Sequence, residues 1–494
     1  MLAQTVEDFT SLDPASGEQF GRAVVAADIL NGPSGTQYWV IAAAPYADVG
    51  GNIAAGEVEF FPTINSPTTP PFKISAPLAH IQADAHFGWS LAAGDCDGDG
   101  TIDLVVGAPH QDVGNVQDQG RVIVLYGPWL PTAVVPYAHW AYLDVLPAEV
   151  SDPQAGEPGG QFGHSVAVGN LNLLLGLDLA VGAPHATFVG PPREPDVGGA
   201  DIFLDVPPND GVTPITRYNH VFTPNIWPSV TRQAGCLYGH AVGISQFAID
   251  QASETLEPWG DVVVGSPNYR WDGAPEVGFL SYHFGHTDLG GNPLWDNTSP
   301  WTLHHLPIYW DLVNGPQYQH YGWALSVADH DGDGWDDVSV GAPGKVETLR
   351  GYIALERGDA HGVWWFTDVP NNWVDVTFGP PVNGPPWHLF GSAVAWFNKD
   401  NQYDLDLLIG APAWNDYGAA FIGHSPAHRY PLSRWYFLST PHADPTPNAG
   451  EQFGWAVCRA LRFGTPQRDE EVIGAPHADV PGYPDAGEVF VFNH

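Results

Sequence analysis

Short apolar runs separated by turn residues recur along the whole chain. In the second of these repeating units the pattern predicts four strands: Trp89 to Ala93, Asp103 to Val106, Arg121 to Tyr126, and one near His139 to Val145. The second run is apolar throughout, as in a buried strand, and the third has the two-residue period of a half-buried strand. Gly and Pro, with 57 and 47 residues, favour turns and short strands over long helices.

Three short motifs mark seven successive units. Each unit begins with an aromatic residue followed by Gly, at Phe20, Phe87, Phe162, Tyr238, Tyr321, Phe390 and Phe453. Gly-Ala-Pro or a close variant follows 20 to 27 residues later, starting at Ala43, Gly107, Gly182, Gly265, Gly341, Gly410 and Gly474. A third glycine precedes the next apolar run, at Gly56, Gly120, Gly199, Gly278, Gly351, Gly418 and Gly487. Such self-similarity at a long period is the signature of a repeat architecture.

Four strands in each of seven units predict an all-β fold, a seven-bladed β-propeller with four antiparallel strands per blade round a central channel. We expect residues 1–494 to form this single domain. The blades are expected to begin near residues 20, 87, 162, 238, 321, 390 and 453.

The two ends of the chain predict how the ring closes. The last unit ends at His494, just after its third strand, and a spare segment from Thr5 to Phe9 precedes the first unit. We therefore expect residues 1–12 to supply the outer strand of the last blade. The alternative is a frayed N-terminus.

Acidic loops lie between the first and second strands of units two and five. Both loops have nine residues, with Asp at positions 1, 3, 5 and 9 and Gly at positions 4 and 6. The expected ligands are Asp95, Asp97, Asp99, Asp103 and the carbonyl of Thr101 in unit two, and Asp329, Asp331, Asp333, Asp337 and the carbonyl of Trp335 in unit five. Alternate residues of a tightly curled loop point inward, so these carboxylates should converge.

Hard oxygen ligands in this number suit calcium better than zinc or magnesium. The loop is not an EF-hand, because position 12 is Val106 in one unit and Val340 in the other. A solvated acidic turn is the alternative, but four convergent carboxylates without a cation would repel one another.

Other units contain weaker versions of the loop. Unit six has five matching positions, which favour a third, weaker calcium site: Asn398, Asp400, Gln402, Asp404 and Asp406. Unit three keeps Asn170, Asn172 and Asp178 but has Leu174 at position 5, so we expect it to hold no metal.

The chain has 16 Lys and Arg against 56 Asp and Glu, a formal charge of −40. This balance argues against a nucleic-acid partner and against docking on an anionic membrane. No apolar run approaches the ~18 residues of a membrane span, and no signal peptide is visible before Arg22, the first basic residue. Cys96, Cys236 and Cys458 make no disulfide framework.

The combination of Phe-Gly, Asp-x-Asp-Gly-Asp-Gly-x-x-Asp and Gly-Ala-Pro resembles the FG-GAP repeat of integrin α-subunit propellers and their bacterial relatives, from Phe20 through Phe492. The resemblance implies a seven-bladed propeller with calcium in the hairpin between the first two strands of some blades. It also implies a role in adhesion, with ligand bound on the face opposite the calcium loops. The sequence differs from integrins in having only two clean calcium loops, fewer than integrins usually carry. It also has no inserted von Willebrand-like domain.

In an up-and-down blade, the loops that follow Gly-Ala-Pro lie on the face opposite the loops between strands one and two. The candidate ligand residues there are Tyr46, Asp48, His110, Asp112, His185, Tyr269, Trp414, His477 and Asp479. A histidine that only caps a turn is the alternative for the His that follows Gly-Ala-Pro. We expect Trp89, Trp323 and Trp455, each two residues after the aromatic residue that begins its unit, to line or plug the channel.

These patterns favour a calcium-stabilised binding or adhesion module, secreted or at the cell surface and monomeric, that presents a loop face to a protein partner. A lectin-like glycan binder is the alternative, because the chain has 20 Trp and 18 Tyr. A propeller lyase or hydrolase is disfavoured, since neither Gly-x-Ser-x-Gly nor His-Glu-x-x-His occurs, and we expect no enzymatic activity. The tripeptide Arg357-Gly358-Asp359 is interpreted as a coincidence.

Overall fold

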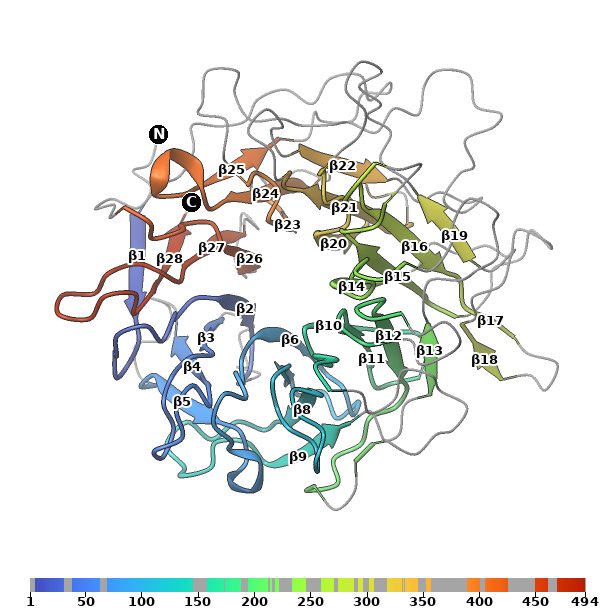
Figure 1. The fold of residues 1–494 in the computed structure, drawn as a ribbon. Coiled ribbons are helices and arrows are strands. Elements are labelled where there is room, and N and C mark those ends of the chain that lie inside the picture. The colour runs from blue at the N-terminus through green and yellow to red at the C-terminus, as the bar shows by residue number, and fades with distance from the viewer. Residues whose placement is uncertain are drawn as a thin grey trace.

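The computed structural model is an all-β ring of blades (Figure 1). The structure describes residues 5–30, 38–62, 69–144, 158–172, 174–187, 194–211, 214–215, 218–221, 233–245, 259–270, 274–287, 292–295, 302–305, 318–330, 332, 334–344, 352–356, 389–399, 405–424, 449–460 and 469–493. Helix in this part of the chain is confined to two short turns, η1 (Leu78–His80) and η2 (Trp414–Asp416). No helix there is long and apolar enough to cross a membrane.

Seven antiparallel sheets surround the axis, and the first strand of each lies innermost, where neighbouring first strands contact one another. The first strands are β2 (Ala23–Ala27), β6 (Ser90–Gly94), β10 (Ser165–Gly169), β14 (Ala241–Ser245), β20 (Ala324–Ala328), β23 (Ala393–Phe397) and β26 (Ala456–Ala460). The second strands are β3 (Trp39–Ala44), β7 (Asp103–Ala108), β11 (Asp178–Ala183), β15 (Asp261–Ser266), β21 (Asp337–Ala342), β24 (Asp406–Ala411) and β27 (Glu470–Ala475).

The third strands are β4 (Glu57–Pro62), β8 (Arg121–Tyr126), β12 (Gly199–Phe203), β16 (Phe279–His283), β22 (Tyr352–Glu356), β25 (Ala419–Gly423) and β28 (Glu488–Asn493). The outer strands are β5 (Phe72–Ser75), β9 (His139–Leu143), β13 (Asn219–Val221), β19 (Thr302–His305) and β1 (Thr5–Thr10), and β17 (His286–Thr287) pairs with β18 (Pro293–Leu294) outside the blades. Blades five and six have three strands each within the described residues. The structure confirms the predicted seven-bladed propeller.

The ring closes as predicted, with the N-terminal strand in the last blade. In Figure 1 the blue β1 lies beside the red β28, and the two strands pair antiparallel from Thr5 opposite Asn493 to Thr10 opposite Glu488. The chain that follows β1 is also bound to the first blade. There Glu59 on β4 accepts hydrogen bonds of 2.7 Å from the Ser11 hydroxyl and 2.7 Å from the Leu12 amide. Residues 5–12 therefore connect blade seven to blade one.

Both faces of each blade are covered by its neighbours, which explains why the second strands are buried along their length. Strands β7 and β11, for example, are buried at all six positions. The prediction that Arg121 to Tyr126 is a half-buried strand is wrong, because every residue of β8 is buried as well. Its one charged side chain, Arg121, is paired with Asp144 at 2.6 Å.

The third glycine of a unit brings the next blade close. Gly120 forms a parallel bridge with Phe162, the aromatic residue that begins blade three. Its φ is +89°, and a Cβ at this position would lie 2.1 Å from the Phe162 carbonyl oxygen. Gly487 does the same against Phe20, where a Cβ would also lie 2.1 Å from the carbonyl oxygen, across the closing interface. In unit three the prediction of Gly199 is wrong, because Gly198 forms the bridge, to Tyr238.

Replacing Gly120 with Ala should therefore destabilise the ring by more than the roughly 1–2 kcal/mol that a positive φ costs alanine. The matched control is Gly114→Ala, because Gly114 also has positive φ, +63°, but faces open space. Urea unfolding of the two variants measures the difference. Equal losses of unfolding free energy would show that contact between blades is not the reason for the glycine.

Candidate metal centre and channel mouth

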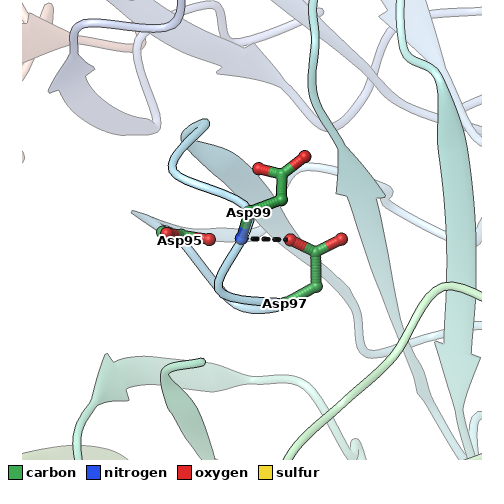
Figure 2. A group of neighbouring side chains, drawn as sticks. All are labelled: Asp95, Asp97 and Asp99. Carbon is green, nitrogen blue, oxygen red and sulfur yellow. Dashed lines mark hydrogen bonds between the residues drawn. The ribbon is translucent and has the colours of Figure 1, made fainter. Parts of the chain in front are cut away.

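The loop between β6 and β7 is folded by its own aspartates. Asp95 accepts hydrogen bonds from the amides of Gly98 at 2.8 Å and Gly100 at 2.9 Å, one on each carboxylate oxygen. Both glycines have positive φ, +76° and +87°, which explains their place in the motif. The amide of Asp99 donates to Asp97 at 3.2 Å. These bonds wrap the loop into a tight turn with its carboxylates gathered round it (Figure 2).

Three of the predicted ligands lie together in this turn. Asp95, Asp97 and Asp99 each offer a carboxylate oxygen, and these oxygens lie within 4.8 Å of one another. Burial raises the pKa of the Asp97 carboxyl, and the charges of Asp99 and Asp95 raise it further. Within the described residues, no Lys, Arg or His forms an ion pair with any of the three. The carboxylates therefore suit a divalent cation with a flexible oxygen shell, which is the ligand preference of calcium.

The ninth loop position has a structural role. Asp103 is 1% exposed, and its two oxygens accept hydrogen bonds from the amides of Cys96 at 2.7 Å and Gly127 at 2.9 Å. Burial raises its pKa to about 7. Asp178 binds the amides of Leu171 and Asp205 in the same way in blade three, at 2.7 and 3.0 Å, although that loop lacks the acidic cluster. This aspartate thus ties the loop to the end of the third strand, and a metal-ligand role for Asp103 stays a prediction.

Blade five repeats this loop geometry. Asp329 accepts hydrogen bonds from the amides of Gly332 at 2.8 Å and Gly334 at 2.9 Å, which are the distances found in blade two. Asp337 accepts from the amide of His330 at 3.1 Å. The remaining carboxylates of this predicted site, Asp331 and Asp333, lie outside the described residues. Ligand roles for the carbonyls of Thr101 and Trp335 stay predictions.

In blade six, three of the five predicted ligands, Asp400, Gln402 and Asp404, lie outside the described residues. The other two are engaged in local contacts: the amide of Asn398 donates to Asp469 at 2.7 Å, and Asp406 accepts from the amide of Lys399 at 3.3 Å.

In blade three, the side-chain amides bond within the loop. Asn170 donates to the carbonyl of Leu174 at 3.3 Å, and Asn172 accepts from the amide of Leu174 at 2.9 Å. That this loop holds no metal stays a prediction.

The family model of the FG-GAP repeat matches residues 87–125 and 321–363, the units with the two acidic loops. The chain carries FG-GAP repeats. The repeats found here have curated relatives in two kinds of protein. Residues of this chain are 33% identical over 120 positions to bovine (Bos taurus) phosphatidylinositol-glycan-specific phospholipase D, 22% of this chain and 14% of that protein.

Integrins are the second kind. The chain is 38% identical over 107 residues to integrin alpha-7 of Rattus norvegicus, 21% of this chain and 8% of the integrin, and 30% identical over 111 residues to human integrin alpha-6, 22% and 9%. The matches span a small part of each relative. They support the presence of the FG-GAP repeat. The activities of the whole relatives are properties of those proteins.

On the opposite face, the aspartates that follow Gly-Ala-Pro fold their own loops. Asp48, Asp112 and Asp479 each accept a hydrogen bond from the amide six residues later, at 2.9, 2.9 and 3.0 Å. The histidines that directly follow Gly-Ala-Pro are also paired locally. Nδ1 of His110, His185 and His477 lies 3.3, 3.0 and 3.0 Å from Asp118, Asp196 and Asp485. These pairs agree with the turn-capping alternative, and a ligand role for these residues stays a prediction.

Two of the candidate ligand residues belong to the core. Tyr269 is fully buried, and its ring packs 4.5 Å from that of Phe279. Trp414 is 9% exposed and packs 4.9 Å from Phe421. The prediction of a ligand-facing side chain is therefore wrong for Tyr269 and unsupported for Trp414, because in both units the loop folds the aromatic ring inward over the third strand.

The face opposite the acidic loops has an aromatic and basic centre, which we call the channel mouth. It comprises the side chains two residues after each leading aromatic residue: Arg22, Trp89, His164, His240, Trp323, Ser392 and Trp455. Arg22 lies 4.0 Å from the ring centroid of Trp89 and 4.9 Å from that of Trp455.

From Trp89 the contacts continue round the axis, with centroid distances of 5.8 Å to His164, 4.8 Å from His164 to His240 and 4.4 Å from His240 to Trp323. The three Trp lie where the sequence predicted. Arg22 and the two His were missed, although they occupy the same repeat position.

Proposed function

We propose that this protein is a calcium-stabilised adhesion or binding module, secreted or at the cell surface, that holds a protein partner at the channel-mouth face. The proposal depends chiefly on the convergence of Asp95, Asp97 and Asp99 in an FG-GAP loop. The relationship to integrin α subunits supports an adhesive role, and the charge of −40 disfavours nucleic acid and anionic lipid as partners.

The role proposed for calcium is structural. The three carboxylates of the blade-two loop hold the ion, and the ion in turn offsets their repulsion and fixes the hairpin, so its binding free energy adds to folding. In blade five Asp329 starts a loop of the same shape, and we extend the proposal to Asp331 and Asp333, while Asp103 and Asp337 at position 9 are proposed as further ligands in each loop. Blade six is proposed as a weaker third site.

The partner face is assigned by elimination between the two ends of the ring. On one face, the acidic loops of blades two and five are proposed to hold the ion, whereas the channel mouth on the other face gathers Arg, His and Trp side chains from several blades. Aromatic residues and Arg are the side chains enriched where proteins bind one another. A monomeric ring that presents this face is the simplest arrangement.

A lectin-like role is the second candidate, favoured by the Trp side chains of the mouth. Its weakness is that Trp89 is already engaged: Arg22 lies 4.0 Å over its ring, and His86 lies 5.9 Å away, inclined by 21°. Sugar recognition by stacking needs a free aromatic face. An enzyme is the third candidate, since bovine phosphatidylinositol-glycan-specific phospholipase D shares the repeat. The similarity covers 14% of that protein and identifies no catalytic group in this chain.

Adhesion of the immobilised protein to cell or matrix surfaces in calcium tests this proposal. We expect binding that is lost when the surface is treated with protease and retained after periodate oxidation of its glycans. Chelation should weaken binding by loosening the ring. The opposite pattern, loss with periodate and survival of protease, would replace the protein partner with a glycan.

A further inference from the structure

Arg22 is a half-buried cation without an acidic partner. Its guanidinium carbon is held between two tryptophans, 4.0 Å from the centroid of Trp89 and 4.9 Å from that of Trp455. Its hydrogen bond to Gln19 Oε1 is long, 3.5 Å. Among the residues that the structure describes, no carboxylate oxygen lies within ion-pair distance of this guanidinium. Within the described residues, the two cation–π contacts, this long hydrogen bond and the nearby Tyr46 offset the desolvation of this charge.

Such a cation is unusual in this chain, where acids outnumber bases 56 to 16. Three other basic side chains have carboxylate partners: Lys73 has Glu57 at 2.9 Å, Arg121 has Asp144 at 2.6 Å, and Lys399 has Glu471 at 3.7 Å. Arg459 on β26 forms no ion pair within the described residues, but its charge acts on Asp469 nearby: burial raises the pKa of that carboxyl, and Arg459 lowers it in part. Burial lowers the pKa of Arg22, which means that the charged form is held at a cost. A group that is buried, charged and unpaired is incomplete until an anion binds it.

Two histidines near Arg22 offer unsatisfied polar atoms. His86 and His164 both have a buried Nδ1 without a hydrogen-bond partner in the described part of the chain. Burial lowers the pKa of His164, and the nearby His240, His185 and Arg22 lower it further. The seven side chains of the channel mouth include no acid. Arg22 thus lies near two unused imidazole nitrogens, one of His164 in the mouth and one of His86 beside it.

We propose that the channel mouth is a carboxylate-binding site, in which Arg22 receives an Asp or Glu side chain of the protein partner. This inference rests on the proposed function and names the chemical group that the partner inserts. A guanidinium binds a carboxylate through two parallel N–H bonds, and the flanking tryptophans exclude water from the pair. His86 and His164 are placed near it as further polar groups.

A side-chain carboxylate fits better than an acidic sugar. The face of Trp89 is covered by Arg22, and His86 stacks near the same ring, so a pyranose ring finds no platform there. A long acidic polysaccharide would also be repelled by the net charge of −40. One carboxylate on a flexible stem can approach the guanidinium without either difficulty.

Acetate is the minimal probe, titrated at constant ionic strength with calcium saturating and followed by tryptophan fluorescence and melting temperature. We expect a saturable response in the wild-type protein that disappears in Arg22→Gln and weakens by about tenfold in Arg22→Lys, which keeps the charge and loses the planar fork. Arg270→Gln is the matched control. It removes one positive charge from an exposed position on the same side of the ring and should leave acetate affinity unchanged.

An acetate response that survives Arg22→Gln, or none in the wild-type protein, would overturn the inference, and the folded Arg22→Lys variant keeps the test decisive if Arg22→Gln does not fold. Stronger binding of methyl glucuronide than of acetate, together with binding of uncharged methyl glucoside, would replace the protein carboxylate with a glycan. Calcium-dependent adhesion is measured separately. Its survival alongside a negative acetate result would refute the carboxylate site and leave the proposed function standing.

Discussion

Deletion of residues 1–12 should lower the melting temperature by about 5 °C or more. The deletion removes β1 with its six paired positions against β28 and the contact of Phe9 with Phe61, whose ring centroids lie 5.1 Å apart. It also removes the two hydrogen bonds that Glu59 accepts from Ser11 and Leu12. Together these losses amount to about 5 kcal/mol, and in a chain of 494 residues each kcal/mol corresponds to about 1 °C.

Differential scanning calorimetry of the shortened protein provides the measurement. Deletion of residues 1–4 alone is the control, since it removes no residue of β1. The longer deletion should also increase self-association, because β28 becomes an open sheet edge. An unchanged melting temperature would mean that blade seven is stable without its outer strand.

Chelation of calcium should produce the second large effect. At 10 mM calcium, sites with the ~0.1–1 mM affinity of extracellular modules each stabilise the fold by about 1.4–2.7 kcal/mol. Two sites therefore predict a fall of about 3–5 °C when EDTA is added. Asp97→Asn should lose roughly half of this difference, because it removes one of three convergent charges.

The matched control for this variant is Asp84→Asn. Asp84 is exposed, has φ of +57° and belongs to a loop on the other side of the ring, and Asn tolerates positive φ. Its variant should keep the full response to chelation. If EDTA lowered the melting temperature of both variants equally, calcium bound at the acidic loop would not be the source of the stabilisation.

The repeat made the fold predictable from sequence to an unusual degree. The spacing of Phe20-Gly21 and its six counterparts predicted the blades, and the missing fourth strand after Glu488–Phe492 predicted the position of β1. The reason is physical: the glycine at each described interface has room for hydrogen alone, as at Gly120 against Phe162. The pattern is a direct consequence of how the blades pack.

Details that depend on packing between blades were harder to predict. The two-residue alternation of β8 suggested a half-exposed strand, but a propeller covers both faces of its third strands. Asp103 matched the calcium motif by position, yet its carboxylate turns inward to two backbone amides. Sequence position does not reveal the direction of a side chain in a loop.

The channel mouth shows the same limit for function. Trp89, Trp323 and Trp455 were predicted to lie at the channel because they share one repeat position. Arg22 stands at that position in unit one, but its significance depends on lacking a carboxylate neighbour, which only the three-dimensional arrangement reveals. The tripeptide Arg357-Gly358-Asp359 lies outside the described residues and stays a prediction of coincidence.

Calcium titration by isothermal calorimetry tests the central claim most directly, because it measures calcium binding itself. The protein is first stripped of metal with a chelator, which is then removed. The account predicts saturable binding in the wild-type protein, one site fewer in Asp97→Asn, one site fewer in Asp331→Asn, and the loss of both in the double variant. The weak site of blade six would remain as a low-affinity tail. The absence of binding heat at millimolar calcium, or the same number of sites in wild type and Asp97→Asn, would contradict the account.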